Sequence, residues 1–389
     1  MLGFGFLAAF FPPALLDRVL LESGRVEQRS RLLPSKPVVY YVLAMALYAG
    51  EGYRELFRLL SEGLRALDPS LPVTVPQKSA FSKARERVGS APLRRLFEEA
   101  AAPMAEAGTQ GAWYRSWRLM SIDGSTLEVP DTPENARAFG RPSVSRGERS
   151  AYPRVRWVAL GEVGTRAIVG VSLGAYSESE SSLAKPLLAR LEPGMLCICD
   201  RAYLGFDAWQ RACTGGAELP WRLKHNAVFQ VEERLPGGSF LSQLLGSPLD
   251  RRKGLPGVRV RVIEYAHDDP GRPQAAERHR LATTILNPKV APAGELAALY
   301  AKRWDVEISI KEVTTSPGRP QLVLRSRKPD GVIQELYGFA CVHYAIRWLL
   351  HQAALGASVD PDRHSFPFTG GLRALRRKLS RPESFSPGT

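Results

Sequence analysis

The amino-acid sequence predicts an α/β protein, in which a helical N-terminal domain precedes a mixed sheet flanked by helices. Three observations predict this class. Residues 14–115 carry apolar side chains at helical spacing, with Pro and Gly between the segments. From Trp117 onward, strand and helix patterns alternate, which is typical of a sheet covered by helices. Several alternating segments at about 219–286 predict a β-rich insertion.

The N-terminal part contains a candidate DNA-reading unit. Residues 38–47 form one apolar run, and residues 53–64 repeat apolar side chains at helical spacing. Residues 79–87 predict a helix with a basic exposed side, which Gly89-Ser90-Ala91-Pro92 separates from a further helix. A helix, a turn and a basic helix in this order can read DNA. A helical cap packed on the rest of the protein fits the same pattern equally well.

The sheet is predicted from a series of short segments. Residues 118–129 are a strand candidate that Asp123-Gly124-Ser125 interrupts. Two strands around a Gly-containing turn are expected next, at 155–160 and 166–173. A helix at 181–191, a short buried strand at 195–199 and a helix at 206–213 follow them.

The second half of the chain ends in helices. Within the insertion, residues 258–264 alternate Val with Arg and predict a half-exposed strand with a basic face. A long helix is expected from about 292 to 314, and a second, apolar helix from 332 to 354. The tail, residues 360–389, is rich in Pro, Ser and Arg. Its basic segment 373–378 fits a contact with phosphates, and a merely solvated tail fits as well.

The composition favours a polyanionic partner. The chain has 389 residues and a formal net charge of +14, with Lys and Arg spread along its length. Its four cysteines form neither a disulfide framework nor the paired spacing of a zinc site, and Cys197 and Cys199 fit a buried strand. The apolar start lacks the features of a signal peptide, and no stretch reaches the length of a membrane span, so we expect a cytoplasmic protein.

Two acids follow apolar strand segments. Asp123 stands in Ser121-Ile122-Asp123-Gly124, and Asp200 comes directly after Leu196-Cys197-Ile198-Cys199. Carboxylates at the ends of neighbouring strands converge, and their repulsion must be neutralised by cations. Oxygen ligands of this kind suit Mg²⁺ or Mn²⁺, and two such ions can catalyse phosphoryl transfer. The third ligand should be an acid from a helix.

Glu307 fills this place. Four side chains lie three and four residues apart and therefore share one face of the predicted helix: Tyr300, Arg303, Glu307 and Lys311. An acid between two bases and a phenol suits a site that binds a metal and the adjacent phosphates. Taken alone, the same stripe could be a surface ladder of ion pairs. Asp131, Asp207 and Asp305 lie near these motifs, and we expect them on the surface.

Together these motifs resemble the insertion-sequence-4 family of bacterial DDE transposases, whose third acid lies in a Y-x2-R-x3-E-x6-K signature. Tyr300, Arg303 and Glu307 match it, with Trp304 after the arginine. Asp123 and Asp200, the latter with Arg201, match the first and second acid motifs. The resemblance covers roughly residues 10–375. It implies an RNase H-like core with a β-strand insertion between the second and third acids.

The resemblance also implies the domains and partners. We expect a helical DNA-binding domain at 1–115, a catalytic domain at 116–355 with an insertion at about 215–286, and a basic tail at 356–389. Asp123, Asp200 and Glu307 would hold two Mg²⁺ or Mn²⁺ ions. Residues expected to contact DNA are Tyr300, Arg303, Lys311, Arg201 and Trp304. The substrate would be double-stranded DNA, namely the inverted-repeat ends of the element and a target, bound by a homodimer at the bacterial nucleoid.

Family members cut DNA through a hairpin and flip a base onto an aromatic ring, a role open to Trp304 or Trp221. For either Trp, a place in the core is the stronger expectation. One departure from the signature concerns activity. The final Lys falls at Thr314, and Lys311, one turn from Glu307, is the candidate to replace it. Two alternatives therefore stay open: a metal-dependent nuclease of the same fold, and a decayed copy that binds DNA without cutting it.

Overall fold

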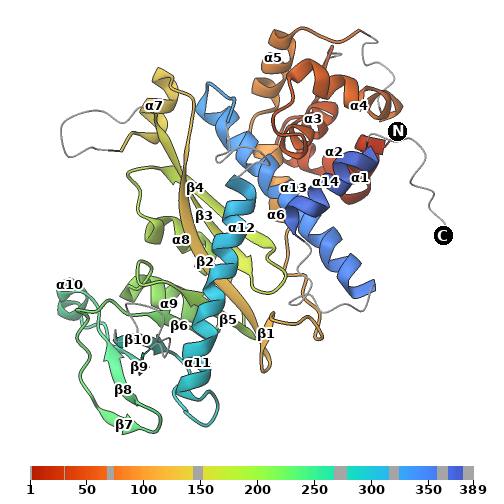
Figure 1. Ribbon diagram of the computed structural model, residues 1–389. Coiled ribbons are helices and arrows are strands. Elements are labelled where there is room, and N and C mark those ends of the chain that lie inside the picture. The colour runs from red at the N-terminus through yellow and green to blue at the C-terminus, as the bar shows by residue number, and fades with distance from the viewer. Residues whose placement is uncertain are drawn as a thin grey trace.

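The structure, a computed structural model, describes residues 2–29, 31–67, 74–142, 152–266, 278–314, 324–356 and 367–379. Helices from the N-terminal part gather with the last two helices at one end of the molecule, and the β-insertion lies at the other (Figure 1). The sheet between them carries the predicted acids. None of the helices in these ranges is long and apolar enough to cross a membrane.

The N-terminal part is helical, as predicted. Its helices are α1 (Leu2–Phe10), α2 (Pro13–Glu22), α3 (Ser35–Leu47), α4 (Tyr53–Leu67), α5 (Lys78–Val88) and α6 (Ala91–Ala100). Pro13 and Pro92 stand in the first turns of α2 and α6, where a missing N–H costs nothing. Helix α3 is apolar all round and buried along its whole length, because other helices surround it.

One mixed sheet runs through the rest of the molecule. Its strands are β1 (Trp113–Tyr114), β2 (Trp117–Glu128), β3 (Arg154–Glu162), β4 (Ile168–Ala175), β5 (Met195–Cys199), β6 (Pro220–Arg222), β7 (Glu233–Leu235), β8 (Ser239–Leu244), β9 (Val258–Ala266) and β10 (Arg278–Thr283). The order is β4-β3-β2-β5-β6-β10-β9-β8-β7. Strands β4, β3 and β2 pair antiparallel, whereas β2, β5 and β6 pair parallel. This arrangement confirms the predicted RNase H-like fold class.

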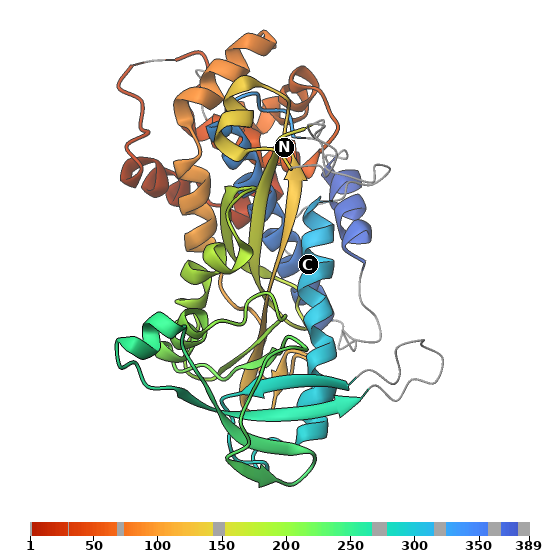
Figure 2. The ribbon, with the colours of Figure 1, turned by 90° about the vertical axis from the view of Figure 1, so that its left-hand side faces the viewer.

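Helices cover the sheet on both faces. They are α7 (Pro133–Phe139), α8 (Glu180–Leu188), α9 (Phe206–Thr214), α10 (Pro248–Arg252), α11 (Ala293–Tyr300), α12 (Trp304–Thr314), α13 (Pro329–Gly356) and α14 (Phe368–Leu379). Helices α11 and α12 follow each other as one nearly continuous rod across the sheet (Figures 1 and 2). The long helix predicted over 292–314 is interrupted only by a 3-10 turn, Ala301–Arg303.

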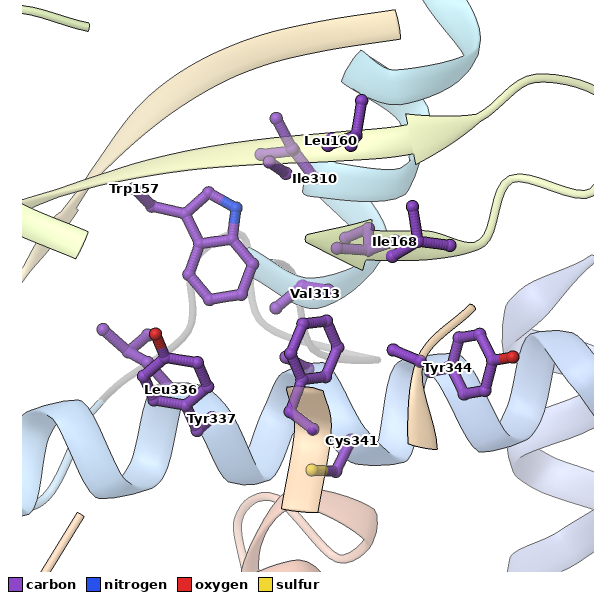
Figure 3. Packing of buried hydrophobic residues seen from close by; sticks show 14 of the residues in the cluster. Trp157, Leu160, Ile168, Ile310, Val313, Leu336, Tyr337, Cys341 and Tyr344 are labelled. Carbon is purple, nitrogen blue, oxygen red and sulfur yellow. The ribbon is translucent and has the colours of Figure 1, made fainter. Parts of the chain in front are cut away.

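The main core joins the sheet to α12 and α13. In Figure 3, Trp157 and Ile168 from β3 and β4 face the side chains of α13, among them Leu336, Tyr337 and Cys341. Val313 of α12 lies between the two layers. The indole of Trp157 is fully buried. Helix α12 is therefore held between the sheet and α13.

Three local predictions were wrong. Strand β2 is not interrupted at Asp123, because it stays paired with β3 from Met120 to Glu128. Strand β9 exposes less of a basic face than predicted, because Arg259 is exposed but Arg261 is fully buried and donates to the Ala291 carbonyl. The tail is not simply solvated: Leu372 and Leu375 of α14 are buried, and Arg376 Nε donates to the Leu47 carbonyl. The rest of the predicted tail, 357–366 and 380–389, lies outside the described residues.

A buried ion pair joins the N-terminal helices to α13. Arg85 of α5 lies 3.1 Å from the Glu335 carboxylate, and both side chains are almost fully buried. Its guanidinium also donates to Gln334 Oε1 at 2.9 Å and to the Tyr53 hydroxyl at 2.9 Å. This face of α5 therefore serves packing, whereas Lys78 and Lys83 remain exposed.

Arg85→Ala is expected to lower the free energy of unfolding by about 3–5 kcal/mol, because it leaves Glu335 buried without its partner. Urea unfolding followed by tryptophan fluorescence measures the change. Arg58→Ala is the control, since its pair with Glu55 is exposed and should contribute at most about 1 kcal/mol. Equal effects of the two substitutions would contradict the structural role of Arg85.

Candidate functional site

The first two acids lie side by side where the parallel pairing of β2 and β5 ends. Ile122 pairs with Cys199 at the last position of this pairing, and Asp123 and Asp200 are the next residues on the two strands. Asp200 directly follows β5, as predicted. Asp123 lies inside β2 and not at its end, because β3 keeps β2 extended as far as Glu128.

Asp123 is a half-buried carboxylate with one cationic contact. Its Oδ1 accepts from the Gly124 N–H at 2.8 Å, and its Oδ2 accepts from Arg303 Nη1 at 3.2 Å. Burial raises the pKa of Asp123 to about 6, and the charges of Glu307 and Glu180 act in the same direction, against Gly124 N–H and Arg303. The effect of burial on this acid therefore outweighs that of the guanidinium that contacts it.

Asp200 is oriented by a tyrosine. The Tyr300 hydroxyl donates to Asp200 Oδ1 at 3.0 Å. Burial and the charge of Asp200 both raise the pKa of Tyr300, so this hydroxyl stays protonated and acts as a donor. Arg201, the next residue, is exposed at the same edge of the sheet.

Glu307 is linked to Asp123 through Arg303. Arg303 Nη1 donates to Glu307 Oε1 at 2.6 Å and thus bridges the first and third acids. Although burial lowers the pKa of Arg303, Tyr300, Glu307 and Asp123 together raise it above its ordinary value. The structure thus brings together five of the residues singled out from the sequence.

The other predicted DNA contacts lie around this group. Lys311 is exposed on α12, one helical turn beyond Glu307. Trp304 is 55% exposed, so it does not belong to the core, and the Arg303 guanidinium lies 4.9 Å from its ring centre. Trp221 is fully buried, and its Nε1 donates to the Cys197 carbonyl. Of these two tryptophans, Trp304 therefore presents its ring to solvent, beside Arg303.

Polar contacts hold α12 from the opposite face. Asp305 accepts from the Gly164 N–H at 3.1 Å and pairs with Arg166, so the expectation that it lies on the surface was wrong. Ser309 donates to the Arg166 carbonyl at 2.9 Å. Further along, Glu312 accepts from Arg347 Nε at 2.9 Å and contacts His343 Nε2 at 3.0 Å. Asp131 and Asp207 are exposed, as expected.

The donors at the site suit a hard divalent cation. Asp123, Asp200 and Glu307 offer carboxylate oxygens, the ligands that Mg²⁺ and Mn²⁺ prefer. Within the described ranges, no three His, Cys, Asp or Glu side chains are close enough together to hold a metal ion. Arg303 instead supplies positive charge to Asp123 and Glu307. A divalent cation would meet the same electrostatic requirement.

Glu180 also lies next to the acids, although no sequence motif pointed to it. Its carboxylate contributes to the raised pKa of Asp123, and its side chain lies against Gly124. Glu180 follows the N-cap Ser179 in the first turn of α8, where an acid is common on helix-dipole grounds alone. Only the tertiary contacts distinguish it.

Two family models together match most of this chain. The model of the insertion element 4 transposase N-terminal region matches residues 2–98, and that of the transposase DDE domain matches residues 117–344. The second match includes Asp123, Asp200 and Glu307.

Two relatives come from Escherichia coli (strain K12). The transposase InsG for insertion sequence element IS4 is 30% identical over 390 aligned residues, which cover 98% of this chain and 84% of the relative. The putative transposase InsZ is 27% identical over 217 residues, which cover 56% of this chain and 70% of the relative. A solved structure of the piggyBac transposase synaptic complex with hairpin DNA aligns over 98% of this chain and 82% of its own, with 12% identity and a TM-score of 0.46.

Mn²⁺ binding to this site is expected to weaken as the pH falls through about 6, because protons and metal then compete for Asp123. The raised pKa moves this loss to a higher pH than for an ordinary Asp, whose pKa is 3.8. The affinity should fall up to about tenfold per pH unit below this point and stay level above it. Electron paramagnetic resonance of free Mn²⁺ measures the affinity. An affinity that stays constant down to about pH 4.5 would contradict the assignment.

Proposed function

Because this chain belongs to the insertion element 4 family of DDE transposases, we propose that Asp123, Asp200 and Glu307 are its catalytic acids. The chain is a DNA transposase, an enzyme with nuclease and strand-transfer activity. The observation that carries the assignment is the bridge of Arg303 between Asp123 and Glu307, next to the strand end that holds Asp200. Acids far apart in the sequence meet at one edge of the sheet.

Transposases of this family use divalent metal ions, and we propose two Mg²⁺ or Mn²⁺ ions held by the three acids. When bound, two such ions activate the attacking oxygen and stabilise the leaving oxygen of a phosphodiester. The carboxylate ligands fit these ions in their chemistry, since oxygen donors are the ligands that Mg²⁺ and Mn²⁺ prefer.

The neighbouring side chains orient the acids and bind phosphates. Tyr300 donates to Asp200 and so keeps one of its oxygens in a fixed direction. Arg303 has five N–H donors in a planar fork, which suits a DNA phosphate as well as a carboxylate. Lys311 shares the face of Glu307 and, in this proposal, contacts the DNA backbone in place of the family's lysine at Thr314. Arg201, which is exposed next to Asp200, is proposed as a further contact to a DNA phosphate.

Trp304 is the proposed stacking platform for an extruded base. Its exposed ring lies directly beside Arg303, and stacking on an aromatic ring contributes about 1–3 kcal/mol per base. A base flipped out of the duplex next to the acids could therefore be held without reading its identity.

The proposed substrates are the inverted-repeat ends of the element and a target DNA. The net charge of +14 supports binding to double-stranded DNA beyond the catalytic edge. The exposed Lys78 and Lys83 of α5 give the N-terminal helices, proposed to span residues 1–115, a surface for such contact. Two ends must be held together during transposition, so we propose a homodimer in the DNA complex, acting at the nucleoid.

In an assay with labelled end DNA, supercoiled target DNA and Mg²⁺, the wild-type protein is expected to cut the ends and join them to the target. Asp123→Ala, Asp200→Ala and Glu307→Ala should each lower cleavage by at least about 1000-fold, because each removes a ligand needed in the transition state. Asp207→Ala is the control, since this acid is exposed and pairs with Lys185.

The same assay separates the alternatives. Cleavage without joined product would identify a metal-dependent nuclease of this fold. Binding of the ends without any cleavage by the wild type would identify a decayed copy, in which Thr314 is the first position to revert to Lys. Unchanged cleavage in Asp123→Ala and Glu307→Ala would show that the acids are wrongly assigned.

Trp304→Ala is expected to lower cleavage about 10- to 100-fold, whereas Trp304→Phe should retain most of it, because Phe still offers a ring for stacking. Fluorescence of 2-aminopurine placed at the end of the element reports whether the base leaves the stack. Trp348→Ala is the control, since this exposed Trp packs on Phe10 away from the site. Equal losses in Trp304→Ala and Trp304→Phe would argue against stacking.

A further inference from the structure

Glu180 lies on the other face of the sheet from the Asp123 side chain. Successive residues of a strand point to opposite faces. Asp123 points towards the 3-10 turn before α12, where Arg303 contacts it, so Gly124 faces α8. Glu180, the first residue of α8, approaches β2 from this second face.

The contact with Gly124 is close. A Cβ atom on residue 124 would lie 2.8 Å from Glu180 Cδ and 2.9 Å from its Cγ, which is closer than such atoms can approach. Only glycine therefore lets Glu180 lie against this part of β2. The Gly124 N–H is also the group that donates to Asp123 Oδ1. Glu180 thus packs on the peptide that orients the first acid.

One oxygen of the Glu180 carboxylate contacts the turn that begins at Asp200. The Tyr203 hydroxyl donates to Glu180 Oε2 at 3.3 Å, and the Tyr203 ring is buried. The Tyr203 N–H donates to the Asp200 carbonyl at 3.1 Å, so Asp200 and Tyr203 are the two ends of one tight turn. A single side chain therefore contacts both the residue after Asp123 and the turn that begins at Asp200.

Arg156 fixes this carboxylate in place. Arg156 Nη1 donates to Glu180 Oε1 at 2.8 Å, and its Nη2 donates to the Tyr176 carbonyl at 3.0 Å. The Ser179 side chain caps the start of α8 by accepting from the Ser182 N–H. Glu180 is thus held by its own helix, by β3 and by the turn after β5.

From these contacts we propose that Glu180 is a positioning residue that sets the separation and orientation of Asp123 and Asp200 for metal binding. The inference rests on the proposed role of these two acids. Glu180 is not itself proposed as a ligand, because its two oxygens are engaged by Arg156 and Tyr203 on the far face of β2. Residues that hold metal ligands in place typically change metal affinity about 10- to 100-fold when they are substituted.

The test is the Mn²⁺ affinity of the full chain, measured by electron paramagnetic resonance of the free ion. Glu180→Ala is expected to weaken binding at least about tenfold. Tyr203→Phe, which removes one hydroxyl, and Gly124→Ala, which forces Glu180 away, should weaken it by smaller factors. Glu178→Ala is the matched control and should bind as the wild type does, because this acid, two residues earlier, caps only the Ala175 N–H.

Asp123→Ala is measured alongside and separates two kinds of failure. If Asp123→Ala loses Mn²⁺ binding while Glu180→Ala and Tyr203→Phe keep the wild-type affinity, the inference on Glu180 is overturned and the catalytic acids stand. If Asp123→Ala also keeps the wild-type affinity, the proposed acids are wrong and the inference falls with them. Thermal unfolding identifies variants that have lost the fold, in which case Tyr203→Phe, the smallest change, decides the matter.

Discussion

Parallel pairing between β2 and β5 places the first two acids, and the geometry of the site depends on it. Strand β5 is short and almost entirely buried, so its apolar residues fix it in the middle of the sheet. Its pairing with β2 ends at Cys199, and Asp200 leaves the sheet there. Because side chains alternate along a strand, a shift of one residue in this register would turn Asp123 away from α12. The buried strand thus sets the position of a polar site that it does not itself form.

The third acid depends on the way α12 is held. Glu307 lies on one face of this helix, next to Arg303 of the preceding 3-10 turn, and the opposite face carries Asp305, Ser309 and Glu312. All three residues of the second face bind fixed partners, in the turn between β3 and β4 and on α13. Burial lowers the pKa of His343, and Arg347 lies with Glu312 in the same buried group. The rotation of α12 about its own axis is therefore restrained by side chains that never face the acids.

Local sequence patterns predicted which acids and which helical residues form the site. The strand end before Asp200 and the spacing of Tyr300, Arg303 and Glu307 follow from local patterns, and hydrogen bonds join Asp200 to Tyr300 and Arg303 to Glu307. Asp123 also contacts Arg303, although β2 continues past it to Glu128. Periodicity failed where a distant segment covers a residue. Arg261 alternates with valines as an exposed residue would, yet the segment before α11 buries it. Asp305 and Glu180 likewise gain their roles from partners more than 20 residues away, which no short motif reveals.

The balance of charge explains why Arg303 is central. Arg156 pairs with Glu180 on one face of the sheet. Its positive charge is therefore used there and does not offset the charges of Asp123, Asp200 and Glu307. On the other face, the guanidinium of Arg303 contacts Asp123 and Glu307, whereas Asp200 accepts from the uncharged Tyr300 hydroxyl. A DNA phosphate would add further negative charge at this edge, and it can approach only if cations offset the carboxylates. In the proposed metal-bound state, divalent ions would offset the charge of Asp123 and Glu307, and the planar fork of Arg303 would then be available to a DNA phosphate.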